Sequence, residues 1–149
     1  MGLDMYLSAR RHINDYNEKD VPVAAAITAA IPGLEAFKVS GVRVEIGYWR
    51  KANAIHRWFV ENVQDGRDDC QESWVDREDL EELLELVKTV EANPEQAEEL
   101  LPATSGFFFG STEYDEGYRD DLCLTRKILE QALNSDVLEG WDFYYQASW

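Results

Sequence analysis

The sequence predicts an α+β fold in a single domain spanning residues 1–149, with a small, mostly antiparallel sheet packed against helices. Three observations support this prediction. The length of 149 residues is typical of one domain with one hydrophobic core. Hydrophobic residues make up 45% of the chain and aromatic residues 12%, which is enough to fill that core. Segments with strand and helix periodicity are mixed along the chain, without strict βαβ alternation and without an internal repeat.

Five segments have the pattern of strands. Apolar and polar residues alternate in residues 2–7, 42–48 and 141–146, the period of a half-buried strand. In the second segment the apolar face comprises Val42, Val44, Ile46 and Tyr48. Residues 107–109 form a short apolar run between two glycines, which predicts a buried strand, and residues 73–75 are a further candidate.

Helices are expected between these strands. Asp76 is the predicted N-cap of a helix over residues 77–90, in which apolar residues recur every three or four positions. Similar spacing predicts helices at residues 20–31, 49–63 and 113–134, the second of them directly after a strand. Asn93 followed by Pro94 opens a short helix that ends before Pro102.

The formal net charge of −16 is confined to one part of the chain. Residues 61–121 contain 20 acidic and 4 basic residues, whereas the rest of the chain contains equal numbers of each. A negative surface argues against binding to nucleic acid or to anionic membranes. Two interpretations remain, a solvated surface that keeps the protein soluble and a surface that binds a basic protein.

The binding interpretation centres on four glutamates in the predicted helix at 77–90: Glu78, Glu81, Glu82 and Glu85. Like charges four positions apart destabilise a helix by about 0.2–0.5 kcal/mol per pair. They also repeat at about 6 Å along the helix. This repeat is close to the spacing of phosphates along one strand of nucleic acid, so the nucleic-acid-binding groove of a basic protein could accept such a face. Our leading hypothesis is therefore a non-enzymatic binder of a basic protein, with blockage of a nucleic-acid site as one consequence.

Residues 48–59 contain the densest cluster of chemically reactive side chains. If this segment is helical, Trp49, Asn53 and His56 lie close to one face. Trp49 could then stack on a ligand, Arg50 could hold an anion and His56 could carry a proton. The competing interpretation is structural, because aromatic residues at helical spacing usually belong to the core.

The alternative hypothesis is a small-ligand-binding protein or an enzyme whose pocket is built around that cluster. The pocket would join Trp49, Arg50, Asn53 and His56 to Asp4, Tyr6 or Asp69. His56 and Asp69 are the candidate catalytic residues. Under this hypothesis His56 should face a solvent-connected cleft with a carboxylate nearby.

Several catalytic signatures are absent from the sequence, namely GxGxxG, GxxxxGK[ST], GxSxG and HExxH. Their absence excludes easily recognised nucleotide-binding, hydrolase and zinc-protease families but not enzymes in general. No cofactor and no metal are expected. The acidic run at residues 65–69 lacks the EF-hand pattern, and the histidines and cysteines lack zinc-ligand spacing.

The chain is expected to reside in a reducing cytoplasm. Its longest nearly apolar run, residues 21–31, is too short to span a bilayer, and the N-terminal residues do not form a secretory signal. The two cysteines, Cys70 and Cys123, form no CxxC pair and are too few for a disulfide scaffold.

Several sequence blocks together span nearly the whole chain. They are MGLDMYL at residues 1–7, EIGYWRKANAIHRWFV at 45–60, QD at 64–65 with DC at 69–70, LLP at 100–102, SGFFFGSTEYDE at 105–116, WDFYYQ at 141–146 and SW at 148–149. In these blocks the chain resembles an uncharacterised family of small proteins encoded by bacteriophages and prophages. The resemblance implies an accessory role in the cytoplasm of a host bacterium, so that the basic partner would be a host protein. It implies no particular activity.

Aromatic residues recur with period two towards the C-terminus, at Trp141, Phe143, Tyr145 and the final residue, Trp149. Chain ends usually fray, and several exposed aromatics would form an unusual apolar patch. We therefore expect residues 141–146 to be a strand within the sheet, with Phe143 and Tyr145 buried against helices, or else part of a homodimer interface.

Overall fold

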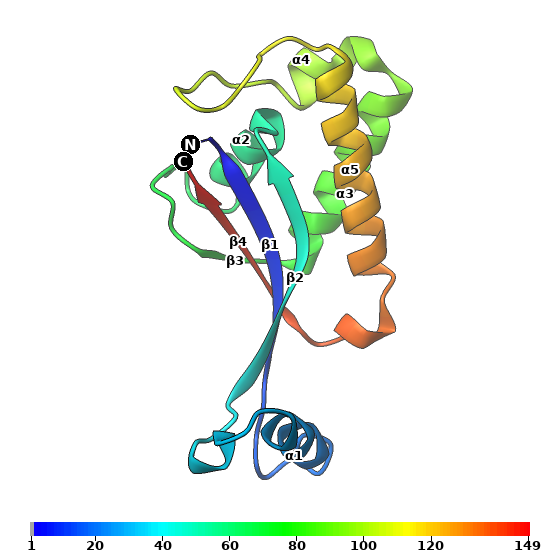
Figure 1. Ribbon diagram of the computed structural model, residues 1–149. Coiled ribbons are helices and arrows are strands. Elements are labelled where there is room, and N and C mark those ends of the chain that lie inside the picture. The colour runs from blue at the N-terminus through cyan, green and yellow to red at the C-terminus, as the bar shows by residue number, and fades with distance from the viewer. Residues whose placement is uncertain (1) are drawn as a thin grey trace.

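The computed structural model describes residues 2–149 and confirms the α+β fold (Figure 1). Four strands form one antiparallel sheet in the order β2-β1-β4-β3. The strands are β1 (Asp4–His12), β2 (Gly41–Arg50), β3 (Ser73–Val75) and β4 (Asp142–Ser148). The α-helices are α1 (Val21–Ala30), α2 (Asn53–Asn62), α3 (Arg77–Ala92), α4 (Ala97–Leu100) and α5 (Glu116–Leu133), and short 3-10 helices are η1 (Leu34–Ala36), η2 (Pro94–Gln96) and η3 (Asp136–Leu138).

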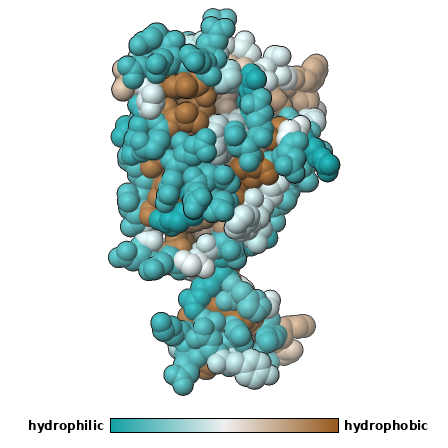
Figure 2. Space-filling model, turned by 180° about the vertical axis from the view of Figure 1, so that it is seen from behind, coloured by the Kyte–Doolittle hydropathy of each residue, from teal (hydrophilic) through white to brown (hydrophobic). Residues whose placement is uncertain are grey.

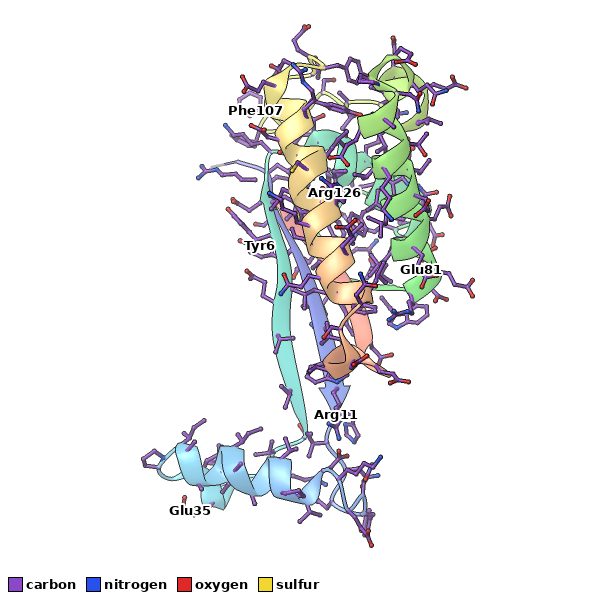
Figure 3. All side chains as sticks on the ribbon, turned by 90° about the vertical axis from the view of Figure 1, so that its right-hand side faces the viewer. Tyr6, Arg11, Glu35, Glu81, Phe107 and Arg126 are labelled. Carbon is purple, nitrogen blue, oxygen red and sulfur yellow. The ribbon has the colours of Figure 1, made fainter. Side chains whose placement is uncertain are left out.

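The hydrophobic core lies between one face of the sheet and helices α2, α3 and α5. Alternate residues of β1 and β4 face the helices, because successive side chains in a strand point to opposite sides. The fully enclosed side chains on these two strands include Met5, Leu7 and Tyr145. Tyr6 lies on the side of the sheet away from α3 (Figure 3).

Helix α3 begins as the sequence predicts. The Asp76 side chain accepts a hydrogen bond from the Glu78 amide, and the Asp79 side chain accepts one from the Asp76 amide, which completes a capping box. The apolar stripe of α3 is buried against the core and α5, and comprises Leu80, Leu83, Leu84, Val87 and Val90. The predicted short helix after Asn93 is also present, as η2 and α4.

The strand predicted at residues 42–48 is longer than expected, and the prediction of its apolar face is wrong. The register between β1 and β2 shifts next to Leu7, so one residue of β2 bulges. Beyond the bulge Trp49 faces the core while Tyr48 is 40% exposed and lies against Tyr6. The strand continues to Arg50, and Lys51 then adopts a left-handed conformation (φ 60°), so the helix predicted from residue 49 begins only at Asn53.

Residues 107–109 form a turn, so the strand predicted there is wrong. The Phe109 ring folds back over Gly106, where an added Cβ would lie 2.5 Å from the ring. A glycine is therefore required at this position. The Phe108 carbonyl instead accepts a hydrogen bond from the Leu3 amide at 3.2 Å, which attaches this loop to the N-terminal end of the sheet.

The C-terminal strand is confirmed. Strand β4 lies between β1 and β3, and both Phe143 and Tyr145 are buried. No helix within residues 2–149 is long and apolar enough to cross a membrane.

Strands β1 and β2 extend beyond the other two strands as a two-stranded ribbon. At its far end the ribbon carries residues 13–40, called the tip below, with α1 and η1 (Figure 1). A narrow neck separates the tip from the remainder of the molecule, called the body (Figure 2). The tip is thus held away from the acidic helices.

Candidate functional site

The four glutamates singled out in the sequence all lie on the solvent face of α3. Glu78, Glu81, Glu82 and Glu85 are exposed, because the opposite face of the helix is buried. Glu81 points away from α5 and from the sheet (Figure 3). The helix therefore presents a continuous row of carboxylates over its first three turns.

Local cations neutralise only part of this row. Arg77 Nε lies 3.3 Å from Glu81 Oε1, and Lys88 Nζ lies 3.2 Å from Glu85 Oε1. Within residues 2–149, Glu78 and Glu82 form no ion pair. Exposed pairs of this kind contribute at most about 1 kcal/mol each, so an incoming cation could displace them.

Next to this row, a groove of about 310 Å³ lies between α2, α3 and α4. Its lining includes three glutamates, Glu61, Glu82 and Glu99, and one cation, Arg57, beside the apolar side chain of Leu86. Arg57 Nε is 2.8 Å from Glu61 Oε1, which leaves the other two carboxylates without a cation among residues 2–149. The excess of carboxylates in this groove suits an arginine or lysine side chain.

His56 lies in the core and not in a cleft. It is 1% exposed, and the Phe109 ring packs edge-on against it at 5.2 Å. His56 Nδ1 is 2.8 Å from the Tyr145 hydroxyl. His56 Nε2 is 3.0 Å from Asp68 Oδ1, although the angle is too poor for a hydrogen bond.

The environment of Tyr145 keeps its phenol protonated. Burial, and secondarily the Asp68 charge, raise the pKa of Tyr145 well above its ordinary value. The phenol therefore keeps its proton within the hydrogen bond to His56 Nδ1. Asp68 also accepts a hydrogen bond from Trp149 Nε1 at 2.9 Å. This network ties the C-terminus to α2.

The predicted face joining Trp49, Asn53 and His56 does not exist, because Trp49 belongs to β2 and not to a helix. Its indole is fully buried and donates to Thr125 Oγ1 of α5 at 2.8 Å. Asn53 is also buried and fully engaged. It donates to the carbonyls of Phe109 and Ser111 and accepts from the Thr104 amide.

The other residues of the predicted pocket lie elsewhere. Asp4 and Tyr6 project from the outer face of the sheet, where the Tyr48 hydroxyl donates to Asp4 Oδ1 at 2.5 Å. Asp69 is exposed and accepts from the Gln71 amide at 3.3 Å. The carboxylate beside His56 belongs to Asp68, the residue before Asp69. The single pocket expected from the sequence is therefore not formed.

Two of the predicted ligand-binding residues do meet in a different cleft. Arg50 and Asn53 line a hollow of about 240 Å³ together with Lys51, Ser111 and Asp121. Burial, and to a lesser degree the neighbouring carboxylates of Asp120 and Asp115, raise the pKa of Asp121 to about 6. Positive and negative side chains thus line one small cleft, yet within residues 2–149 no ion pair joins them.

Sequence reasoning missed Asp68 and Tyr145 as partners of His56. The alternation in residues 141–146 did place Tyr145 inside the sheet, and an enclosed phenol needs a polar partner. His56 was one of two histidines available as that partner. Asp68 carried no comparable signal, because it reaches His56 from an irregular loop.

Among residues 2–149 no group of three or more histidine, cysteine or acidic side chains is arranged to hold a metal ion. Both cysteines are free. The chain matches no family model, and comparison with curated proteins and with solved structures likewise gives no match.

Proposed function

We propose that this chain is an accessory protein of a bacteriophage or prophage that binds a basic protein of the bacterial host and catalyses no reaction. The observation that carries the proposal is the exposed glutamate row of α3. It lies in the segment that holds the whole net charge of −16. The resemblance of the sequence blocks to small phage proteins supports the accessory role in the host cytoplasm.

The groove beside α3 supports the same function. Two carboxylates there, Glu82 and Glu99, lack a local cation among residues 2–149. A partner that supplies arginine or lysine would gain charge-assisted hydrogen bonds in a partly desolvated hollow. Basic grooves commonly bind nucleic acids. A partner bound to this chain through such a groove would therefore be unable to bind DNA or RNA there.

Electrostatic recognition of this kind predicts rapid association that weakens with salt. The experiment is capture of host proteins from lysate by the immobilised chain at low and high salt. Wild type should retain a basic protein at low salt and release it at high salt. Failure to recover any basic protein at either salt concentration would refute the proposal.

A matched pair of variants makes this test specific to α3. The first variant carries Glu78→Lys, Glu81→Lys, Glu82→Lys and Glu85→Lys. The control carries Glu18→Lys, Glu45→Lys, Asp136→Lys and Glu139→Lys, four exposed acids outside residues 61–121 that form no ion pair among residues 2–149. Both change the net charge equally, so only the first should abolish capture.

A second candidate function is the binding of a small zwitterion in the cleft lined by Arg50, Lys51 and Asp121. The supporting observation is that its cations and carboxylates are not paired with each other. A volume of about 240 Å³ suits a molecule as small as an amino acid. Titration with free amino acids, followed by amide chemical shifts, should move residues around Asp121 in wild type and not in Asp121→Asn. The absence of shifts in wild type would exclude this candidate.

A further inference from the structure

The tip of the β1/β2 ribbon has an exposed apolar surface that the proposed function does not use. Helix α1 has the sequence VPVAAAITAA and contains no buried residue. Around it, Tyr16 is 94% exposed, Phe37 is 73% exposed and Ile31 is 51% exposed. Several large apolar side chains exposed on one small unit are typical of an interaction surface.

Helix α1 also lacks the local features that stabilise a short helix. It is ten residues long, its N-cap residue Asp20 makes no capping hydrogen bond, and no charged side chain complements either end. Asp20 instead binds Arg11 and the Asn14 amide. Isolated helices shorter than about 12–15 residues are marginal in water. Burial of α1 against another surface would supply the missing stabilisation.

The shape of the tip is complementary to itself. A hollow of about 680 Å³ is lined by small side chains of α1, among them Ala25, Thr28 and Ala29, and by Phe37. Phe37, at 73% exposed, lines that hollow and also faces solvent. One surface therefore offers both a projecting aromatic ring and a shallow depression, as a two-fold symmetric contact requires.

The size of the patch agrees with a stable dimer. Exposed aromatic side chains contribute about 150–250 Å² each, and the open side of a helix about 15 Å long adds to them, which gives an apolar patch on the order of 600 Å². A standard interface buries about 800 Å² per partner, of which about 65% is apolar in homodimers. An apolar patch of this order would make up most of the apolar part of such an interface.

The charge distribution favours a second copy bound at the tip over a second copy bound elsewhere. The acidic segment 61–121 makes two bodies repel each other. The tip lies at the opposite end of the ribbon from α3 and α5 (Figure 1). Its charges are few and of both signs, and Lys38 Nζ is 2.7 Å from Asp15 Oδ2. With a Debye length of about 8 Å at physiological salt, a tip-to-tip contact leaves the two bodies screened from each other.

We infer that the chain forms a symmetric homodimer through the tip, with Phe37 of each copy seated in the α1 hollow of the other. This inference is independent of the glutamate row on α3. A dimer of this geometry directs the two acidic bodies away from each other, so each remains free to bind a basic partner.

Sedimentation equilibrium of the full chain over a wide concentration range tests the inference. Wild type should approach twice the monomer mass of 17.1 kDa. Phe37→Asp should raise the dissociation constant by about 100-fold or more, since it places a charge in the interface centre. Val137→Asp is the matched control. Val137 is 75% exposed on η3 of the body, and its replacement should leave the dimer intact.

Cross-linking separates a tip-to-tip contact from a tip-to-body contact. Ala25→Cys should form an intermolecular disulfide under mild oxidation, whereas Val137→Cys should not. Circular dichroism of Phe37→Asp should retain the signal of α3 and α5, because the tip lies apart from the body. A wild type that stays monomeric at every concentration would overturn the inference. Equal weakening by Phe37→Asp and Val137→Asp would overturn it as well.

Discussion

The Tyr145 hydroxyl and His56 Nδ1 form a hydrogen bond of 2.8 Å inside the core. The Tyr145 ring also stacks on Phe59, with ring centroids 3.9 Å apart and planes within 6°. A single side chain therefore links β4 to α2 in two ways, one polar and one apolar. These two contributions can be separated experimentally.

Tyr145→Phe should destabilise the protein by about 1–3 kcal/mol. The substitution keeps the ring stack and leaves His56 Nδ1 buried without its hydrogen-bond partner. The measurement is the urea midpoint followed by tryptophan fluorescence. Tyr144→Phe is the control, because Tyr144 lies half-buried on the outer face of the sheet, and it should change stability by less than about 0.5 kcal/mol. Equal effects of the two variants would contradict this account of the His56 hydrogen bond.

Deletion of residues 141–149 should abolish cooperative unfolding. Strand β4 lies between β1 and β3, so its removal breaks the sheet and exposes the core. Removal of Trp149 alone should cost much less, because that residue is 46% exposed and contributes one hydrogen bond to Asp68. Thermal unfolding monitored by circular dichroism compares the two truncations. A cooperative transition in the longer deletion would show that β4 is dispensable.

Asn53→Ala should loosen the loop between α4 and α5. The Asn53 side chain holds this loop at three points, through the carbonyls of Phe109 and Ser111 and the amide of Thr104. Hydrogen exchange should accelerate at residues 104–111, and global stability should fall by about 1–3 kcal/mol. Asn62→Ala, which removes a single bond to the Trp58 carbonyl on the same helix, is the control. Unchanged exchange in the loop would refute this role of Asn53.

Asp121 should make the protein less stable as pH rises from about 4 to about 6. Its folded-state pKa of about 6 lies above the ordinary value of 3.8, so the native state binds the proton more tightly than the unfolded state. Asp121→Asn should remove this pH dependence and stabilise the protein at pH 7 by about 1–2 kcal/mol, a figure reduced for the partial exposure of the carboxyl. Urea unfolding at several pH values measures both effects. Glu98→Gln, at an exposed position of α4, changes the charge equally and should show neither.

Sequence patterns correctly predicted the elements that depend only on residues close together in the chain. The Asp76 cap, the apolar stripe of α3 and the alternation around Tyr145 were all correct for this reason. Trp49 was misplaced because its spacing to Asn53 and His56 also fits one face of a helix. Only the left-handed turn at Lys51 separates strand from helix, and a lysine does not signal such a turn.

The candidate site was predicted in part. The exposure of the four α3 glutamates follows from the apolar stripe on the opposite face of the same helix. The groove formed with Glu61 and Glu99 requires the relative placement of three helices, which no local pattern specifies. The pairing of Asp68 with His56 likewise depends on the path of an irregular loop.

The most direct test of the central claim is the association rate of the captured host protein with wild type, the four-lysine α3 variant and the four-lysine control, measured at several salt concentrations. The account predicts fast, strongly salt-dependent association for wild type and the control. Slow association with little salt dependence is predicted for the α3 variant. Equal loss of association rate in the two variants would contradict the account, because binding would then depend on net charge and not on the face of α3.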